Sequence, residues 1–509
     1  MKLLDLIIIF GYLIGIVLFG AWFGRKQKTT SDYFLGDRAV PWWAVAFSIV
    51  ATETSTITFI SVPGIAFARG GNFQFLQLVF GYLLGRIVIS LLFIPSYFRG
   101  ELLTVYQLLD QRFGGKIKMV AASLFVVMRN IADGIRLLLT AIVLAAVYAS
   151  FQPAANSGTI IAGSIILIGL AMVIFTYFGG MEAVIWVEVV QLGIYIAGAI
   201  AAAIVLISSI DGGLATVNSF AAQVGKYSLF DFTFDHTRTF TFWSGLIGGC
   251  FLTMSTHGTD QYLVQRYLCT DRPRKAIVAL LTSGGIVLAQ FIGFLFIGVL
   301  LFAFYQPFTD PAYATATSTA FPFTGGDRVF PDFITKYMPT GLSGLVVAAI
   351  FAAAMSSSLN SIAATAVNDL YKPFRPARDD KHYLRVSHLL TLIWGIVQIG
   401  VALAIRNQPG SAINQALSIT SLINGPILGV FLVGAFLRRV SQTPALIGML
   451  VSMCSMLYVF LGTKTAWTWY VFLGSLITFV VAWLASFAFS PAVKTLDPIG
   501  PLGPIPDKD

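Results

Sequence analysis

The stretch FAAAMSSSLNSIAATAVNDLYKP, residues 351–373, is the part of this chain that decides its fold. It is predicted to be a helix, and it carries a dense row of hydroxyls: Ser356, Ser357, Ser358 and Ser361. Because residues three or four apart share a helix face, the Ala353 carbonyl should lie beside the hydroxyls of Ser356 and Ser357. Uncharged carbonyl and hydroxyl oxygens suit a weakly held hard cation such as sodium. The alternative is that small and hydroxyl residues let membrane helices pack closely.

Composition places the chain among integral membrane proteins. It is 57% hydrophobic and 11% charged, and its mean hydropathy is +0.82. A stretch of about 20 apolar residues spans a bilayer core, and the sequence predicts an all-α polytopic protein with about thirteen such segments. They lie near 4–23, 42–67, 74–98, 118–149, 158–178, 184–208, 240–265, 276–305, 341–369, 384–405, 411–436, 443–462 and 467–489.

The distribution of Lys and Arg predicts the orientation. With the N-terminus outside and alternate loops inside, 21 of the 32 basic residues fall in inward loops and 8 fall outside. This bias follows the positive-inside rule, so we expect an external N-terminus and a cytoplasmic C-terminus. It also explains the net charge of +9 without a nucleic-acid partner. The expected location is a plasma membrane, the inner membrane of a bacterium.

Two segments are predicted to be broken. The second contains ATETSTIT at 51–58, and the seventh contains Gly248-Gly249 and then STHGTD at 255–260. Ser and Thr compete with helical hydrogen bonds, and a carboxylate at membrane depth is costly. Interrupted segments at matching places in two halves are typical of an inverted-repeat transporter site. The alternative is a kinked helix sealed by its neighbours.

Five separated stretches carry a resemblance to a known family. They are DYFLGDRAVPWWAVAFSIVATETS at 32–55, GGMEAVIWVEVVQ at 179–191, DQYLVQRYL at 260–268, AAAMSS at 352–357 and LNSIAATAVNDLYK at 359–372. In this order they resemble the sodium/solute symporter family, which includes sodium-coupled glucose, proline, sialic acid and monocarboxylate transporters. The similarity runs from about residue 1 to 440.

The resemblance implies a LeuT-like inverted pair of five-helix bundles. The parts would be a first helix and cytoplasmic loop at 1–41, the first repeat at 42–209, the inverted repeat at 240–436, two further helices at 437–489 and a cytoplasmic tail at 490–509.

The resemblance also implies a sodium site between the first and eighth core helices. Carried over by match, its ligands would be the carbonyls of Ala51, Thr54 and Ala353 and the hydroxyls of Ser356 and Ser357. After the serine pair this chain looks three residues shorter than some relatives. Aligned from the downstream side, Ala353 and Ala354 would stand at the serine positions. We prefer the upstream alignment, because it keeps hydroxyls where oxygen ligands are needed.

Some relatives hold a second sodium with an Asp in the fifth core helix and serines in the eighth. The matching residues here are Glu188, with Ser358 and Ser361 as helpers. The alternative is that Glu188 pairs with a basic residue near the inner surface.

Substrate chemistry is suggested by Arg129, Asp133 and Arg136, which form one stripe on a helix because they are spaced by four and three residues. One alternative is an internal ladder of these three charges, closed by Glu53. The other is that Arg136 meets an anionic solute, because its planar fork suits a carboxylate. The residues predicted to bind substrate are Glu53, Thr58, Gln77, Arg136 and His257.

These features predict a sodium-coupled secondary active symporter that imports a small organic solute, with a carboxylate as one candidate. Its partners would be the solute, sodium as the coupling ion, and the lipid bilayer. No constellation of His, Cys and carboxylates indicates an enzyme. A proton-coupled symporter, with Glu53 or Glu188 titrating, and a transporter-like solute sensor are the alternatives.

Overall fold

The structure is a computed structural model, and it describes residues 2–24, 28–54, 56–99, 102–149, 157–305, 326–355, 358–406 and 412–490. Within these ranges the chain forms helices and connecting loops and contains no strand. The predicted all-α class is therefore confirmed.

The first half of the chain forms α1 (Leu3–Gly24), α2 (Thr30–Leu35), η1 (Gly36–Arg38), α3 (Trp42–Glu53), α4 (Thr56–Phe67), α5 (Leu76–Leu92), α6 (Ile94–Tyr97), α7 (Gln107–Phe113), α8 (Gly115–Ala149), α9 (Ser157–Ser208) and α10 (Gly213–Gln223). The second half forms η2 (Ser244–Gly248), α11 (Gly249–Gly258), α12 (Gln261–Leu268), α13 (Pro273–Phe304), η4 (Gly326–Arg328), α15 (Val329–Lys336), α16 (Leu342–Met355), α17 (Leu359–Thr365), η5 (Ala366–Tyr371), η6 (Lys372–Phe374), α18 (Asp380–Ile405), α19 (Ala412–Phe436), α20 (Gln442–Gly462), η7 (Trp467–Trp469) and α21 (Tyr470–Ala485).

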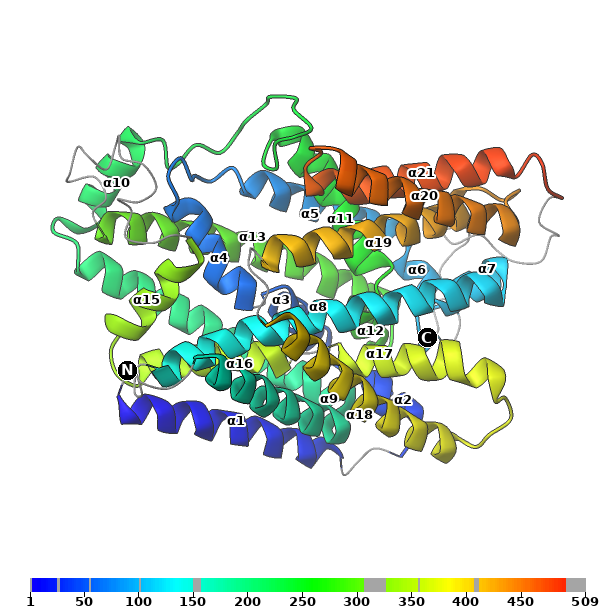
Figure 1. The fold of residues 1–509 in the computed structure, drawn as a ribbon, viewed down its shortest axis with the longest axis horizontal. Helices are drawn as coiled ribbons and strands as arrows, with labels where there is room; N and C mark the ends of the chain where they lie inside the picture. Colours follow the sequence, from blue (N-terminus) through cyan, green and yellow to red (C-terminus); the bar gives the residue numbers. More distant parts are fainter. Residues whose placement is uncertain are drawn as a thin grey trace.

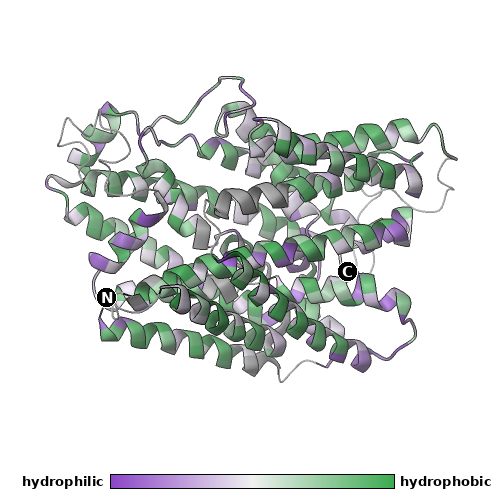
Figure 2. Ribbon diagram, in the orientation of Figure 1, coloured by the Kyte–Doolittle hydropathy of each residue, from purple (hydrophilic) through white to green (hydrophobic). Residues whose placement is uncertain are grey.

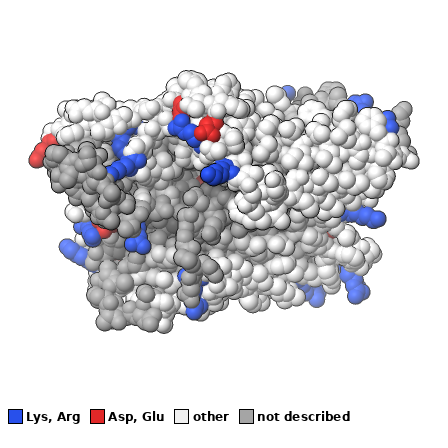
Figure 3. Space-filling model, turned by 45° about the horizontal axis from the view of Figure 1, so that its top comes forward, with Lys and Arg blue, Asp and Glu red and all other residues white. Residues whose placement is uncertain are grey.

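The long apolar helices run along one axis of the molecule (Figure 1), and α1 begins at the end opposite to that where α21 finishes. Apolar residues dominate these helices (Figure 2). On the face in Figure 3 much of the surface is uncharged, and most Lys and Arg side chains gather toward its two ends. This is the surface expected of a protein that crosses a bilayer along that axis.

Within the described residues, six helices are long and apolar enough to cross a membrane, or seven if the bent pair α3–α4 counts as one span. The longest, Gly158–Ser208, has 51 residues and covers two segments that the sequence predicts separately, 158–178 and 184–208. Gly180 divides it, because its φ of 60° and ψ of −165° lie outside helical geometry and favour glycine. The count of thirteen stays a prediction.

The start of α16 is fixed by α1. The Asp5 side chain is fully buried, and its Oδ1 accepts hydrogen bonds from the backbone N–H groups of Gly341 at 2.7 Å and Gly344 at 3.1 Å and from the Ser343 hydroxyl at 2.9 Å. A carboxylate here satisfies free N–H groups at the helix start and complements its dipole. Asp5 thus acts as an N-cap supplied by another helix.

The second half of the broken segment, α4, is held by α13 and by a loop lysine. A side chain on Gly298 would place its Cβ 2.2 Å from the Pro63 carbonyl oxygen, so only glycine permits this approach. Lys226 Nζ, in the loop after α10, donates to the carbonyls of Ala66, Phe67 and Ala68 at 2.6–3.2 Å. Burial lowers the pKa of Lys226 to about 7. The lysine caps the carbonyl end of α4.

The Asp5 contact generates a stability prediction. Asp5→Ala should lower the free energy of unfolding by about 2 kcal/mol, since it leaves buried N–H groups without acceptors. The measurement is thermal unfolding of purified protein, with Asp211→Asn, at an exposed position, as the matched control. An Asp5→Ala protein as stable as wild type would show that α16 does not need this cap.

Candidate functional site

The second apolar segment is interrupted where the sequence predicts. α3 ends at Glu53 and α4 begins at Thr56, and Thr54 between them has non-helical angles of φ −81° and ψ 66°. The described helices on the two sides, Trp42–Glu53 and Thr58–Phe67, meet at 58°. A helix that stops releases the carbonyls of its last turn from regular bonding. Two backbone carbonyls near the break have side-chain partners. Thr54 Oγ1 donates to the carbonyl of Val50 at 2.7 Å, and Thr58 Oγ1 donates to the carbonyl of Glu53 at 2.9 Å.

The segment that carries the serine row is described as α16 up to Met355 and then from Ser358, whose ψ of 10° precedes α17 at Leu359. α16 packs against α4, so this segment is a neighbour of the interrupted one. Ser356 and Ser357, the predicted hydroxyl ligands, lie outside the described residues, and so does the side chain of Ala353. Ala51 and Thr54 are buried at the end of α3.

The seventh segment breaks at the end of its predicted polar run. α11 ends at Gly258, Thr259 has φ −134°, and Asp260 is extended and caps α12 by accepting from the Tyr262 N–H at 2.9 Å. The earlier glycine pair, Gly248-Gly249, lies instead where a π-helix passes into α11. The second and the seventh predicted segments are therefore both interrupted, as the sequence predicts.

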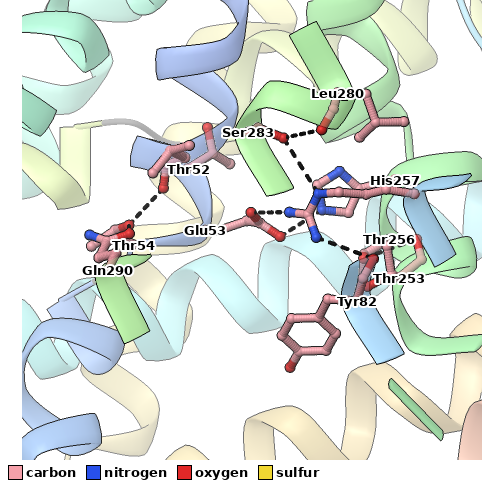
Figure 4. A network of polar contacts seen from close by, with 12 residues as sticks. Thr52, Glu53, Thr54, Tyr82, Thr253, Thr256, His257, Leu280, Ser283 and Gln290 are labelled. Atoms are coloured by element: carbon pink, nitrogen blue, oxygen red, sulfur yellow. Dashed lines mark hydrogen bonds and ion pairs between the residues drawn. The ribbon is translucent and has the colours of Figure 1, made fainter. Parts of the chain in front are cut away.

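A closed polar network fills the space between the two breaks (Figure 4). Glu53 Oε2 pairs with Arg86 Nη2 at 2.5 Å, and Oε1 lies 2.7 Å from His257 Nε2. His257 Nδ1 lies 2.6 Å from the Tyr267 hydroxyl. In Figure 4 the Glu53 carboxylate and His257 point toward each other, and Thr54 lies beside Gln290, whose Oε1 is 2.8 Å from the Thr54 hydroxyl oxygen. Two of the five residues predicted to bind substrate, Glu53 and His257, therefore contact each other at the break, and each also has a further partner.

Arg86 was not among the candidates from the sequence. Its side chain is 1% exposed, and its Nε lies 3.4 Å from Ser283 Oγ on α13. The signal that could have found it is an arginine inside an apolar segment, which normally has a buried acidic partner.

The arginine stripe on α8 is divided among several partners. Arg129 pairs with Asp260, and Asp133 lies 3.8 Å from Arg136 Nη1. Arg136 also donates to the Tyr262 hydroxyl at 3.2 Å, and the Arg129 guanidinium stacks 4.5 Å from the centre of the Tyr262 ring. The expected ladder therefore forms in part. The Asp133–Arg136 pair is present, but Arg129 pairs with Asp260 and Glu53 pairs with Arg86.

Glu188 forms an ion pair with Arg266, at 2.5 Å between Oε1 and Nη2. Ser358 donates to Asp133 Oδ2 from its backbone N–H at 2.9 Å and its hydroxyl at 2.5 Å. Ser361 donates to Gln265 at 2.6 Å. The Glu188–Arg266 pair matches the alternative expectation, that Glu188 has a basic partner. The second sodium site stays a prediction.

Gln77 lies in the first turn of α5, nine residues before Arg86 of the Glu53 network. Its Oε1 accepts from the Asp231 N–H at 2.9 Å, and its Nε2 donates to the Gln74 carbonyl at 3.1 Å. It is 1% exposed. In this conformation Gln77 holds the loop before η2 against α5.

Two interrupted apolar helices that meet at buried polar groups are typical of a secondary transporter. Comparison with known proteins agrees, because the sodium:solute symporter family matches residues 33–452. The chain belongs to this family, and it is a sodium-coupled symporter embedded in a membrane. The predicted family, transport function and coupling ion are confirmed. Members of this family are transporters rather than enzymes.

Relatives cover nearly the whole chain. The sodium/sialic acid symporter NanT of Aliivibrio fischeri is 31% identical over 96% of this chain and 93% of its own length. SiaT of Proteus mirabilis, also a sodium/sialic acid symporter, is 30% identical over 95% of each. The human sodium-coupled monocarboxylate transporter 1 is 27% identical over 90% of this chain and 73% of its own.

Solved structures support the LeuT-like fold. A substrate-bound, outward-open Na⁺-coupled sialic acid symporter matches with a TM-score of 0.83 at 29% identity, over 97% of this chain and 100% of that one. Mhp1, a nucleobase-cation-symport-1 family transporter, matches with a TM-score of 0.56 at 14% identity, over 90% and 95%. The second likeness concerns the fold alone.

The Glu53 network generates a prediction about its role. Glu53→Gln should lower the free energy of unfolding by about 3 kcal/mol, because it leaves the Arg86 charge buried without a partner. Glu53→Gln/Arg86→Met should recover much of this loss. Thermal unfolding of the variants measures both effects.

The matched control is Asp332→Asn, which removes an ion pair with the largely exposed Lys336 and should cost less than about 1 kcal/mol. If Glu53→Gln were as stable as this control, the pair would contribute little to the fold.

Proposed function

We propose that the transported solute is an organic acid of the sialic acid kind, a sugar carrying a carboxylate. Three observations support this. Two relatives, at 31% and 30% identity, are named as sialic acid symporters, and another is named as a monocarboxylate transporter. Buried arginines line the region between the breaks. An arginine fork binds a carboxylate with charge-assisted hydrogen bonds.

Among these arginines, we propose that Arg136 receives the carboxylate. Its side chain is 16% exposed, whereas the side chains of Arg86 and Arg266 are each 1% exposed. The ion pair with Asp133 spans 3.8 Å, which is long for a direct salt bridge. A solute carboxylate with shorter contacts would compete well there. Glu53, Thr58, Gln77 and His257 are the further residues proposed around the solute.

The proposed sodium site combines the carbonyls of Ala51, Thr54 and Ala353 with the hydroxyls of Ser356 and Ser357. Its support is that α3 ends at Glu53, between two of the residues that would supply the oxygens, and that α16, which carries Ala353, packs against α4. Five uncharged oxygens bind sodium weakly enough to release it. In this proposal the bound ion fixes α4 against α16 and completes the solute site. The sodium ion and the solute then become exposed to the inside together.

The orientation is part of the proposal. The basic loops support an external N-terminus and a cytoplasmic C-terminus in a bacterial inner membrane. Inward flow of one sodium would then contribute about 2.3 kcal/mol per 100 mV of membrane potential. The two proposed inverted repeats are residues 42–209 and 240–436, and the helix bundle is proposed to rock against its scaffold.

Uptake of radiolabelled sialic acid into proteoliposomes under an inward sodium gradient tests the solute assignment. Wild type should accumulate it, and Arg136→Gln should reduce the uptake about tenfold to hundredfold, the value of a charge-assisted contact of about 1.5–3 kcal/mol. Arg136→Lys should also be impaired, because an ammonium lacks the planar fork.

The matched control is Arg406→Gln, at an exposed position at the end of α18, which should transport normally. N-acetylmannosamine, a neutral sugar without the carboxylate, should not compete. Wild-type uptake by Arg136→Gln, or competition by the neutral sugar, would overturn the assignment.

A further inference from the structure

The carboxylate of Glu188 sits in a closed group of oxygens. Glu188 on α9 is fully buried. Ser48 Oγ donates to its Oε2, and Thr52 Oγ1 lies 3.1 Å from its Oε1. Ser48 and Thr52 are four residues apart on α3, so both hydroxyls face α9. One carboxylate and two hydroxyls form an oxygen set that suits a hard cation.

A carboxylate buried in a membrane protein needs a positive partner, since a lone charge there is strongly unfavourable. That partner could be an ion from solution or a side chain. The contacts on the carboxylate decide between them.

The positive partner in this structure is Arg266, from α12. Its Nη2 binds Oε1 of Glu188 at 2.5 Å, and its Nε lies 3.2 Å from Oε2. The same Nε lies 3.0 Å from Ser48 Oγ. The guanidinium thus covers both carboxylate oxygens with its planar fork, and it also uses one of the two hydroxyls.

The guanidinium is fixed from its other side as well. Arg266 Nη1 donates to the Tyr262 carbonyl, and its central carbon lies 4.6 Å from the centre of the Tyr262 ring. The side chain is 1% exposed. Arginine does not lose its proton in proteins, so this positive charge is permanent.

The serines expected to assist a second sodium have other partners. Ser358 donates to Asp133, and Ser361 donates to Gln265. The oxygen group around Glu188 therefore draws its hydroxyls from α3 and its cation from α12.

We propose that Arg266 is a tethered cation that takes the position of a sodium ion beside Glu188, so that the transporter binds a single sodium. The inference rests on the proposed function for that one ion, at the ends of α3 and α16. It predicts that the Glu188 group becomes a sodium site when the guanidinium is removed.

The experiment counts sodium ions bound to the purified full-length protein by ²²Na⁺ scintillation proximity at pH 8, with choline keeping the ionic strength constant. Wild type should bind one ion per chain with a Hill coefficient near 1. Arg266→Gln should bind two. Glu188→Gln/Arg266→Gln, which removes both charges, should return to one.

Two ions in wild type, or a folded Arg266→Gln protein that binds one, would overturn the inference. If Arg266→Gln does not fold, Glu188→Gln/Arg266→Gln decides. This double variant should bind as many ions as wild type, whereas one ion fewer would show that Glu188 normally holds sodium. A wild type that binds no ion would refute the proposed sodium site instead. In that case a gain of one ion in Arg266→Gln would still support the tethered cation.

Discussion

A helix that stops inside a membrane must find new partners for its backbone groups, and this constraint shapes the centre of the protein. At Thr54 the break is surrounded by side chains that meet the need: the hydroxyls of Thr54 and Thr58 donate to carbonyls, and Gln290 Oε1 lies beside the Thr54 hydroxyl. In the proposed site, the carbonyls of Ala51 and Thr54 would offer uncharged oxygens to a partly dehydrated sodium ion. Under this proposal the break in the helix also creates the ion site.

Among the described residues, the acidic side chains nearest the breaks are paired with arginines. Glu53, Asp260 and Glu188 are each paired with an arginine from a different helix. These pairs connect α3 with α5, α8 with the start of α12, and α9 with α12. Because breaking such a pair is costly, the pairs restrict the helices to arrangements in which every charge keeps a partner. A transporter that alternates between two states needs this kind of restriction. Helix positions between the two states would leave buried charges without their partners.

The sequence predicts local features well and long-range partners poorly. The helix break at 51–58 follows from the Thr and Ser residues and the carboxylate there, and the spans follow from apolar length. The ladder on α8 was the natural expectation from the spacing of Arg129, Asp133 and Arg136, yet Arg129 turns to Asp260, which lies 131 residues away in sequence. Likewise the partner of Glu53 is Arg86 on α5. Only the folded arrangement brings these helices together, so no periodicity in the chain could show it. The sequence predicts two segments where the structure has α9. The break between them depends on the positive φ of Gly180, which the spacing of apolar residues does not encode.

The most direct measurement concerns the central claim, that the break in α3–α4 and the serine pair together hold sodium. It is the sodium concentration for half-maximal uptake of sialic acid in proteoliposomes, compared between wild type and Ser356→Ala/Ser357→Ala. Each hydroxyl ligand contributes about 1 kcal/mol, so loss of both should raise that concentration about tenfold or more, with uptake recovering at high sodium. An unchanged sodium dependence in a folded double variant would contradict the account.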